Sequence, residues 1–364
     1  MHSKAPKPPS LELPLYQPPA AMHDPSLSQQ LGWVAGILFL AAALALFLLG
    51  QSPAWSGLIG NLSINFLAMV VEALPFMLIG SLAGGLIEVF VPVHLVERVF
   101  GRHHLCSIFL AGGMGLAFPV CECAIVPVVR RLLGKGVPLG AAITFLLSGP
   151  IVNVVVAAST AIAYSYNWQM VALRLSSGYV IAVVLGLVLG WFWQRGQALL
   201  PDMDKRPLAS CGHEHCASGI ERHTSLWQRF RHALEHALDD FFAIAFYLVI
   251  GAFIAAFVRS TFSMDFFAGL SASPWQAVLL MMAMALMLNL CSEADAFIAA
   301  GFRGLLPVSA QLAFMVLGPM LDIKLLLMYM GLFRAKFIVV LAGSIFVTVF
   351  AAMLALHFLI PVSL

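Results

Sequence analysis

Charged side chains are scarce in this chain. Asp, Glu, Lys and Arg together account for 10% of its 364 residues, whereas 61% are hydrophobic and the mean hydropathy is +0.96. Soluble globular proteins average about 25% charged residues, so the composition excludes that class and predicts a polytopic membrane protein. The net charge of +2 is too small to indicate a nucleic-acid partner.

The sequence also lacks a nucleotide-binding loop, a recognisable signal peptide and a disulfide framework. The sequence has no glycine-rich G-x-x-x-x-G-K-[ST] loop, so we do not expect the chain to hydrolyse nucleotide itself. Residues 1–30 are polar and proline-rich, which predicts a disordered tail rather than a signal peptide. The six cysteines lie mostly in or beside apolar segments, unlike those of a disulfide-stapled secreted domain, so we expect free thiols.

Long apolar runs make up most of the remaining chain and predict an all-α bundle of about 8–10 membrane spans. A spanning helix needs about 20 apolar residues. Residues 31–50 form an extra N-terminal helix in this interpretation, and the polar linker 194–236 separates an N-terminal half, 57–193, from a C-terminal half, 237–364. We count nine candidate spans: 31–50, 57–91, 105–120, 137–162, 168–193, 239–258, 275–290, 305–330 and 337–360. The cysteine-bearing segments 121–133 and 291–303 either cross the membrane or re-enter it.

The two halves resemble each other. An ungapped alignment pairs GVPLGAAITFLLSGPIVN, which ends at Asn153, with LLPVSAQLAFMVLGPMLD, which ends at Asp322. The Gly-Pro pairs that end in Pro150 and Pro319 fall at the same position. We interpret the halves as repeats with proline-broken helices, a pattern that points to a transporter site at the repeat interface. Chance similarity between apolar segments is the alternative.

Lys and Arg are more numerous on one side of the predicted spans. If the linker is inside, the segments on its side carry the excess, so the positive-inside rule places the linker and the C-terminus in the cytoplasm. The expected location is a bacterial inner membrane, with lipid as the surrounding partner.

The motif Cys121-Glu122-Cys123 lies between two prolines in an otherwise apolar region, and Cys291 occupies the corresponding point of the C-terminal half. Converging sulfur atoms suit a thiophilic metal or a trivalent metalloid. The alternative is that these cysteines act as small apolar core residues.

Carboxylates lie in the same two cysteine-bearing segments. Glu122 is next to Cys121, and Glu293 and Asp295 follow Cys291. An intramembrane carboxylate is a candidate proton relay or cation ligand, and solvation at a headgroup interface is the alternative. For Glu72 we favour such an interfacial position. Lys324 either neutralises an intramembrane carboxylate or extends to the interface.

The helix breaks supply a further set of candidate binding groups. Pro150 and Pro319 cannot donate a backbone hydrogen bond, so carbonyl groups one turn earlier are left open to a ligand. Asn153 and Asp322 would add polar side chains beside those carbonyls. A kink satisfied by a neighbouring helix is the alternative.

The linker contains four soft or borderline metal ligands within six residues: Cys211, His213, His215 and Cys216. Their spacing does not match a structural zinc finger, so we expect a flexible loop that binds zinc or copper(I). An unliganded polar loop is the alternative, and no other cofactor is expected.

The cysteine and Gly-Pro motifs carry a family resemblance. FPVCECAIVPVVRRLLGKGVPLGAAITFLLSGPIVN, LCSEADAFIAAGF and LGPMLDIKLLLMY resemble the bacterial predicted-permease family that includes the trivalent organoarsenical efflux permeases. The resemblance covers residues 61–358 and implies an inner-membrane permease with an intramembrane cysteine motif. Ala124 stands where the arsenical members tend to carry glycine, and Val154 stands where proline is often found. These departures place the chain closer to the uncharacterised branch of the family, part of which accompanies metal-handling proteins.

We therefore expect secondary efflux of a thiophilic metal or metalloid, organoarsenical-like species. Cys121, Cys123 and Cys291 would bind it, and the three carboxylates named above would exchange protons. The alternative is a membrane subunit of a metal-handling or uptake complex, which passes metal to an accessory protein; a homo-oligomer also fits. An enzyme is the least favoured reading, because no nucleophile–base pair can be identified.

Overall fold

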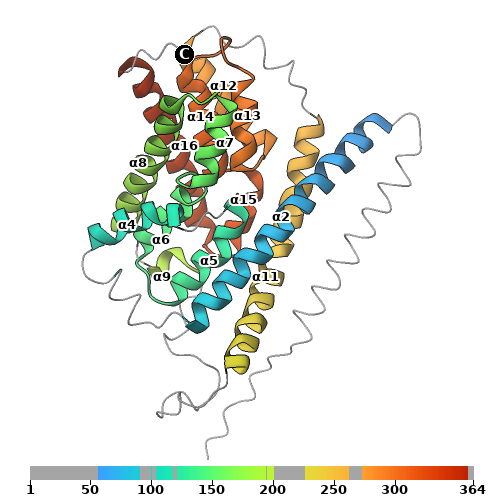
Figure 1. Ribbon diagram of the computed structural model, residues 1–364, viewed down its shortest axis with the longest axis vertical. Coiled ribbons are helices and arrows are strands. Elements are labelled where there is room, and N and C mark those ends of the chain that lie inside the picture. Colours follow the sequence, from blue (N-terminus) through green and yellow to red (C-terminus); the bar gives the residue numbers. More distant parts are fainter. Residues whose placement is uncertain are drawn as a thin grey trace, which may run out of the picture. The chain divides into compact units, whose positions relative to one another are not determined.

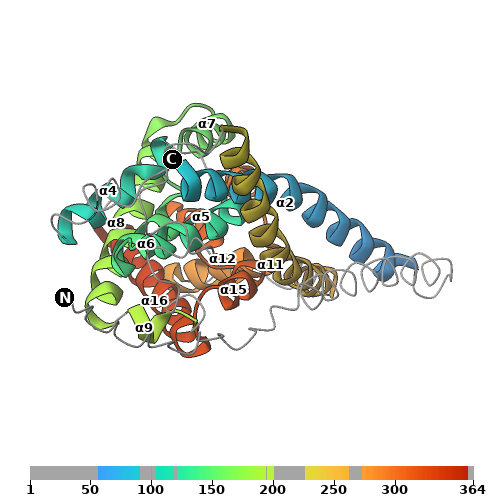
Figure 2. The same ribbon diagram turned by 90° about the horizontal axis from the view of Figure 1, so that it is seen from below.

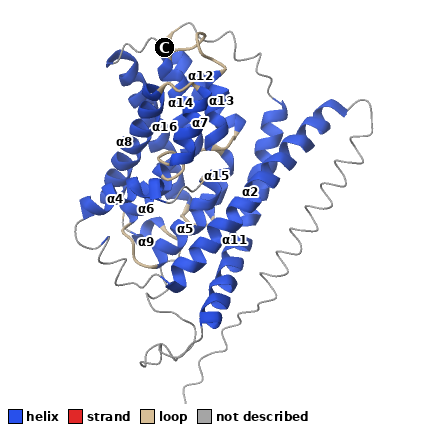
Figure 3. Ribbon diagram, in the orientation of Figure 1, coloured by secondary structure: helices blue, strands red, loops and turns tan. Residues whose placement is uncertain are grey.

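The structure is a computed structural model that describes residues 56–90, 100, 104–117, 121–193, 195–200, 226–261 and 273–359. Within these residues every regular element is a helix, and the one extended pairing is an isolated bridge between Leu199 and Phe333 (Figure 3). The all-α prediction is confirmed. The predicted tail 1–30, the predicted helix 31–50 and the linker ligands lie outside the described residues; the linker ligands are Cys211, His213, His215 and Cys216.

Four stretches of the described chain are long and apolar enough to cross a membrane: Gly60–Ile87, Trp168–Phe192, Val308–Met330 and Ala335–Leu359. The first lies in α2 (Ser56–Phe90), and the second and fourth are α8 (Trp168–Phe192) and α16 (Ala335–Leu359). The third consists of α14 (Val308–Met320) and α15 (Ile323–Met330). A helix of 25 residues is about 38 Å long, which exceeds the roughly 30 Å of a bilayer core.

Six further helices of the described chain have 9 to 15 residues each. They are α4 (His104–Ala117), α5 (Glu122–Gly134), α6 (Leu139–Ser148), α7 (Val154–Ala163), α12 (Pro274–Leu288) and α13 (Ser292–Ala300). At 1.5 Å per residue these helices are about 14 to 23 Å long, too short to cross a bilayer core singly. The nine-span count therefore stays a prediction. α9 (Arg195–Ala198) and the start of α11 (Leu226–Thr261) fall within the segment predicted as linker.

Both predicted helix breaks are present, and each restarts with a polar cap. α6 ends before Gly149-Pro150, and Asn153 begins α7 by accepting a hydrogen bond from the Val156 N–H at 2.8 Å. In the C-terminal half Pro319 still fits in the last turn of α14, and the chain becomes extended only at Leu321 and Asp322. Asp322 begins α15 by accepting from the Leu325 N–H at 2.5 Å. Such caps satisfy backbone donors that a new helix would otherwise leave unpaired.

The two broken segments form the interior of the bundle. α6 is buried along its whole length, and α14 is buried from Ser309 to Met320. α6 packs closely on α8, where a side chain on Gly186 would collide with the Thr144 hydroxyl, and small residues of this kind allow helix backbones to approach. α2 and α11 lie along each other (Figure 1), and α5 lies between α2 and α6 (Figure 2). The cysteine-bearing helix is thus placed against the long helix α2.

Candidate functional site

Two cysteines occupy equivalent positions at helix starts. Cys121 is the N-cap of α5, with φ −74° and ψ 167°, and Cys291 is the N-cap of α13, with φ −76° and ψ 155°. Neither side chain makes a capping hydrogen bond. Each thiol therefore lies at the positive end of a helix dipole, next to the first backbone N–H groups of the helix. It does not accept a capping hydrogen bond from those groups.

Both cysteine segments border one cleft, which is partly open to the outside; the space at the cleft and its mouth, open solvent included, is about 370 Å³. We call it the cysteine cleft. Its walls come from α2, from the starts of α5 and α13, from the residue after α12 and from α15. The lining residues are Met69, Glu72, Ala73, Phe76, Cys121, Glu122, Cys123, Asn289, Cys291, Glu293 and Lys324.

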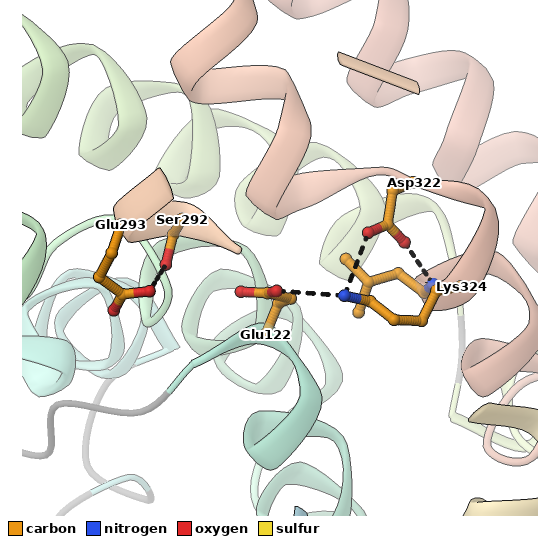
Figure 4. Close-up of polar contacts among 6 residues, drawn as sticks. Glu122, Ser292, Glu293, Asp322 and Lys324 are labelled. Carbon is orange, nitrogen blue, oxygen red and sulfur yellow. Dashed lines mark hydrogen bonds and ion pairs between the residues drawn. The ribbon is translucent and has the colours of Figure 1, made fainter. Parts of the chain in front are cut away.

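Lys324 neutralises carboxylates from both halves of the chain. Its Nζ lies 3.3 Å from Oε1 of Glu122 and 3.6 Å from Oδ2 of Asp322 (Figure 4). The exposed fractions of Lys324, Glu122 and Asp322 are 5%, 1% and 0%, so the ion pairs are shielded from solvent. Of the two alternatives left open for Lys324, the structure shows neutralisation rather than extension to an interface. The contact joins α5 to α15, which are separated by about 200 residues of sequence.

Asp322 is held by three groups at once. It caps α15 through the Leu325 N–H, pairs with Lys324, and accepts a hydrogen bond from the side-chain amide of Asn289 once that amide is oriented to satisfy both groups. Asn289 ends α12 in the left-handed conformation, with φ 50°, and is buried. Asn289 is not among the site residues predicted from the sequence. The available signal was a lone Asn two residues before Cys291, since Asn tolerates this conformation at a helix C-terminus.

One carboxylate oxygen of Glu122 accepts no hydrogen bond from the described residues. Its Oε2 is buried and has no hydrogen-bond partner among the described residues, although the residue lines the cysteine cleft. Glu293, at the start of α13, accepts a hydrogen bond from the Ser292 hydroxyl at 3.3 Å (Figure 4). A buried carboxylate oxygen without a donor is costly, which marks Glu122 as a site for a ligand.

Glu72 lies within the candidate span Gly60–Ile87, which argues against the interfacial position favoured for it. α2 is a single helix of 35 residues, and Glu72 lies near its middle rather than at an end. Its carboxylate lines the cysteine cleft and lies within interaction range of the Cys291 thiol. The position of Glu72 at the cleft could not be predicted from the apolar run 57–91, because the sequence does not show which face of α2 packs against α5.

Five of the ten predicted site residues do not line the cysteine cleft: Pro150, Asn153, Asp295, Pro319 and Asp322. Asn153 is occupied locally, because its amide donates to the Gly149 carbonyl at 3.3 Å while its oxygen caps α7. Asp295 is buried against Gly318, where an added Cβ would lie 2.6 Å from its Oδ2. The cleft gathers Cys121, Glu122, Cys123, Cys291 and Glu293, with Asp322 reached through Lys324.

Arg174 is a fully buried charge that the sequence analysis did not select. From α8 its guanidinium donates to the Thr160 hydroxyl at 2.7 Å, to the Ser292 carbonyl at 2.6 Å and to the Met315 carbonyl at 3.2 Å. It also lies near Asp295. Ser292 directly follows Cys291, so Arg174 fixes the start of α13 from behind the cleft.

Cys106, Cys121, Cys123 and Cys291 are free thiols, as expected. Three of them line the cysteine cleft, but in the part of the chain that the structure describes no three His, Cys, Asp or Glu side chains are close enough to hold one metal ion. The cleft therefore brings soft ligands near one another without assembling a complete metal-binding site. A bound soft ion would require movement of at least one wall.

Comparison with known proteins identifies the family. Residues 59–358 match the family described as predicted permease. This chain belongs to the predicted permease family. The permease is 36% identical over 289 residues to UPF0718 protein YcgR of Bacillus subtilis, which covers 79% of this chain and 94% of the relative. It is also 36% identical over 279 residues to a Streptococcus mutans protein named as a subunit of a two-component membrane permease complex, covering 77% and 89%. No solved structure matches.

The family match confirms the resemblance carried by the cysteine and Gly-Pro motifs. Together with the long apolar helices, it makes the permease a multi-pass membrane protein. Its members are transporters by description, which favours transport over enzymatic activity.

Proposed function

We propose that the permease is a secondary transporter of a bacterial inner membrane that exports a thiophilic metal or metalloid species through the cysteine cleft. One observation carries the proposal: cysteines from both halves of the chain, Cys121, Cys123 and Cys291, border a single cleft together with Glu72, Glu122 and Glu293. Sulfur ligands select soft ions, and a buried carboxylate such as that of Glu122 is rarely retained in a membrane without a functional role.

The proposed transport step moves one cleft wall relative to the other. The cysteine walls are the starts of two short helices, α5 and α13, that belong to different halves, and α6 and α14 after them end in breaks. Broken helices at corresponding positions are typical of transporters in which one repeat rocks against the other. Such movement would bring the sulfur atoms onto the cargo and later separate them.

The energy source follows from what surrounds the cleft. Because the sequence has no nucleotide-binding loop, the proposed export uses an ion gradient or a partner protein. Glu122 and Glu293 line the cleft and are the candidates for proton exchange, with Asp295 as a buried carboxylate behind them. Intramembrane carboxylates commonly serve as such relays.

Transport into everted membrane vesicles tests the proposal. We expect accumulation of at least one of zinc, copper(I), arsenite and methylarsenite, and a drop of about tenfold or more in apparent affinity for that cargo in Cys121→Ser, Cys123→Ser or Cys291→Ser. A tenfold drop corresponds to about 1.4 kcal/mol of lost binding free energy. Cys106→Ser is the matched control, because Cys106 is an exposed free thiol on α4 outside the cleft.

Two results would count against this function. If none of the four species accumulates, the exporter proposal fails. If Cys106→Ser impairs transport as strongly as the three cleft variants, the effect is general thiol loss rather than cargo binding.

A second candidate function is a membrane subunit of a two-component complex, which the Streptococcus mutans relative favours by its name. In this case Cys211, His213, His215 and Cys216 would pass metal to or from the partner protein. Deleting residues 210–217 should then leave vesicle transport by the helices intact and abolish exchange of metal with a co-purified partner. If the deletion variant keeps both vesicle transport and metal exchange with the partner, this second candidate function is ruled out.

A further inference from the structure

We propose that the cargo of the cysteine cleft is a metal cation, and that it binds by taking Glu122 from Lys324. The inference rests on the proposed function and specifies the charge class of its substrate. Lys324 is, in this view, a built-in cation that occupies the carboxylate while the cleft is empty and returns to it when the cargo leaves.

The charge of the site favours a positive ligand. The lining residues include three carboxylates, those of Glu72, Glu122 and Glu293, whereas Lys324 is the one basic residue among them. Asp322 adds a fourth carboxylate that shares the same ammonium group. Buried charges are costly unless they are paired, and the buried carboxylates of Glu122 and Asp322 share a single ammonium group, so the excess of carboxylates favours a further cation.

Lys324 can give up Glu122 without disturbing Asp322, because Asp322 has other donors of its own. Asp322 is fixed by the Leu325 N–H and by Asn289, so it stays in place whichever way Lys324 points. Glu122 offers a second oxygen, Oε2, which is buried and has no partner among the described residues. The lysine stem is flexible, and its ammonium needs only to give up the 3.3 Å contact with Glu122 while keeping Asp322.

A cation that enters beside Cys121 and Cys123 also meets Glu122, which lies between them in the sequence and lines the same cleft. It receives a carboxylate and neighbouring sulfur atoms, which are the ligands of borderline and soft metal cations. Arsenite and methylarsenite are uncharged at neutral pH. They cannot replace the ammonium at Glu122, and they would leave the carboxylates of the cleft uncompensated.

The binding test uses the full-length protein in lipid nanodiscs with silver(I), zinc and methylarsenite as probes. Lys324→Gln removes the competing cation, so we expect the apparent Kd for the bound metal cation to fall about tenfold, equivalent to about 1.4 kcal/mol. That cation should also raise the Tm of this variant by more than it raises the wild-type Tm. Lys336→Gln is the matched control, because Lys336 is exposed at the start of α16. An unchanged or weaker cation affinity in Lys324→Gln overturns the inference.

Lys324→Arg keeps the test valid if the Gln variant does not fold. Its charge is preserved, and a guanidinium can bind two carboxylates with separate N–H groups, so Glu122 is held more firmly. We expect roughly tenfold weaker cation affinity than in wild type. Equal affinity in Lys324→Arg and wild type overturns the proposed exchange.

Wild-type vesicle transport separates this inference from the proposed function. Accumulation of metal cations without arsenite or methylarsenite supports both. Accumulation of methylarsenite without any metal cation leaves the exporter in place and overturns the cationic cargo. Accumulation of no species at all defeats the exporter itself, and the cationic cargo with it.

Discussion

At the scale of single residues, the two helix breaks differ by one charge, and their surroundings explain the difference. Asp322 is buried beside Lys324 and Asn289, which balance and bind its carboxylate. Asn153, at the aligned position, instead donates its amide to the Gly149 carbonyl and has no lysine two residues later, since Val155 aligns with Lys324. The carboxylate is therefore present only in the half that provides its counter-ion.

This difference predicts unequal effects of exchanging the two residues. Asn153→Asp keeps the oxygen that caps α7 but loses the donor to Gly149 and buries a carboxylate without a cation. We expect a loss of about 3–5 kcal/mol in stability, as for other buried charges left uncompensated. Thermal unfolding of the purified protein measures it.

Asn153→Ser is the control for this prediction. Serine can still accept the hydrogen bond from Val156, and exchanges among good capping residues cost little. Its Tm should stay close to that of wild type. An Asn153→Asp protein as stable as Asn153→Ser would show that the two breaks do not differ in charge compensation.

Site residues that are polar or sulfur-bearing within an apolar run could be predicted from the sequence. Residues whose role depends on contacts between helices far apart in the sequence could not. Cys121, Glu122 and Cys291 interrupt apolar runs, and all three line the cleft. Asn289 looked ordinary, because its function depends on the end of α12 meeting α15. For Lys324 the sequence left two alternatives open, and only the approach of α5 to α15 decides between them.

At the scale of helices, close packing of α2 on α5 positions the wall of the cleft. Gly80 of α2 faces Ala124, where an added Cβ would collide with the Ala124 carbonyl oxygen and would lie 2.6 Å from the Ala124 Cα and 2.7 Å from its Cβ. Real Cβ atoms do not approach this closely, and two of these contacts are with backbone atoms that cannot rotate away. Ala124 directly follows Cys123, so the fit of the two helices bears on the cysteine motif.

We therefore predict that Gly80→Ala pushes α2 away from α5 and disturbs the cleft. Overpacking of this kind costs about 1–3 kcal/mol, so the Tm should fall and cargo affinity should weaken with it. Gly60→Ala on the same helix is the matched control, because nothing lies within 4 Å of its added Cβ. Equal Tm and equal transport in the two variants would contradict close packing at Gly80.

Helix positions were easier to predict from sequence than helix ends and crossings. The run 57–91 is one helix, as predicted, and residues 137–162 are broken at Gly149-Pro150. The break in the C-terminal half comes two residues later than the Gly-Pro motif suggests, because Pro319 is tolerated in the final turn of α14. Several predicted spans are helices too short to cross a membrane. An apolar run is found in helices buried inside a protein as well as in helices that face lipid, so the run alone does not identify a span.

At the scale of the whole molecule, buried polar contacts join the N-terminal and C-terminal halves at two places. Lys324 of α15 reaches Glu122 of α5, and Arg174 of α8 reaches the start of α13 and the middle of α14. α7 packs on α13 while α15 packs on α5, so the helix after each break contacts the cysteine helix of the other half. This reciprocal pattern is compatible with the repeat interpretation, which stays a prediction.

Arg174 provides the test at this scale, because it is buried and bonds across the two halves. Arg174→Met removes the donors to Ser292 and Met315 and also removes one of the two cations, Arg174 and Lys324, that interact with Asp295. Breaking a buried charge contact of this kind costs about 3–5 kcal/mol. We expect a large fall in Tm, and dissociation of the two halves when the folded protein is cut by a protease at a site inserted between residues 201 and 225.

Arg303→Ala is the matched control, because Arg303 also contacts the other half but from an exposed position. Its guanidinium lies 5.1 Å from the centre of the Tyr164 ring and 3.5 Å from the Ser165 hydroxyl. Exposed cation–π contacts contribute about 0.5–1 kcal/mol, so the cut Arg303→Ala protein should remain associated on size-exclusion chromatography. If cut Arg174→Met also stays together with an unchanged Tm, apolar packing alone joins the halves, and the guanidinium of Arg174 is not needed to hold α13 at the cleft.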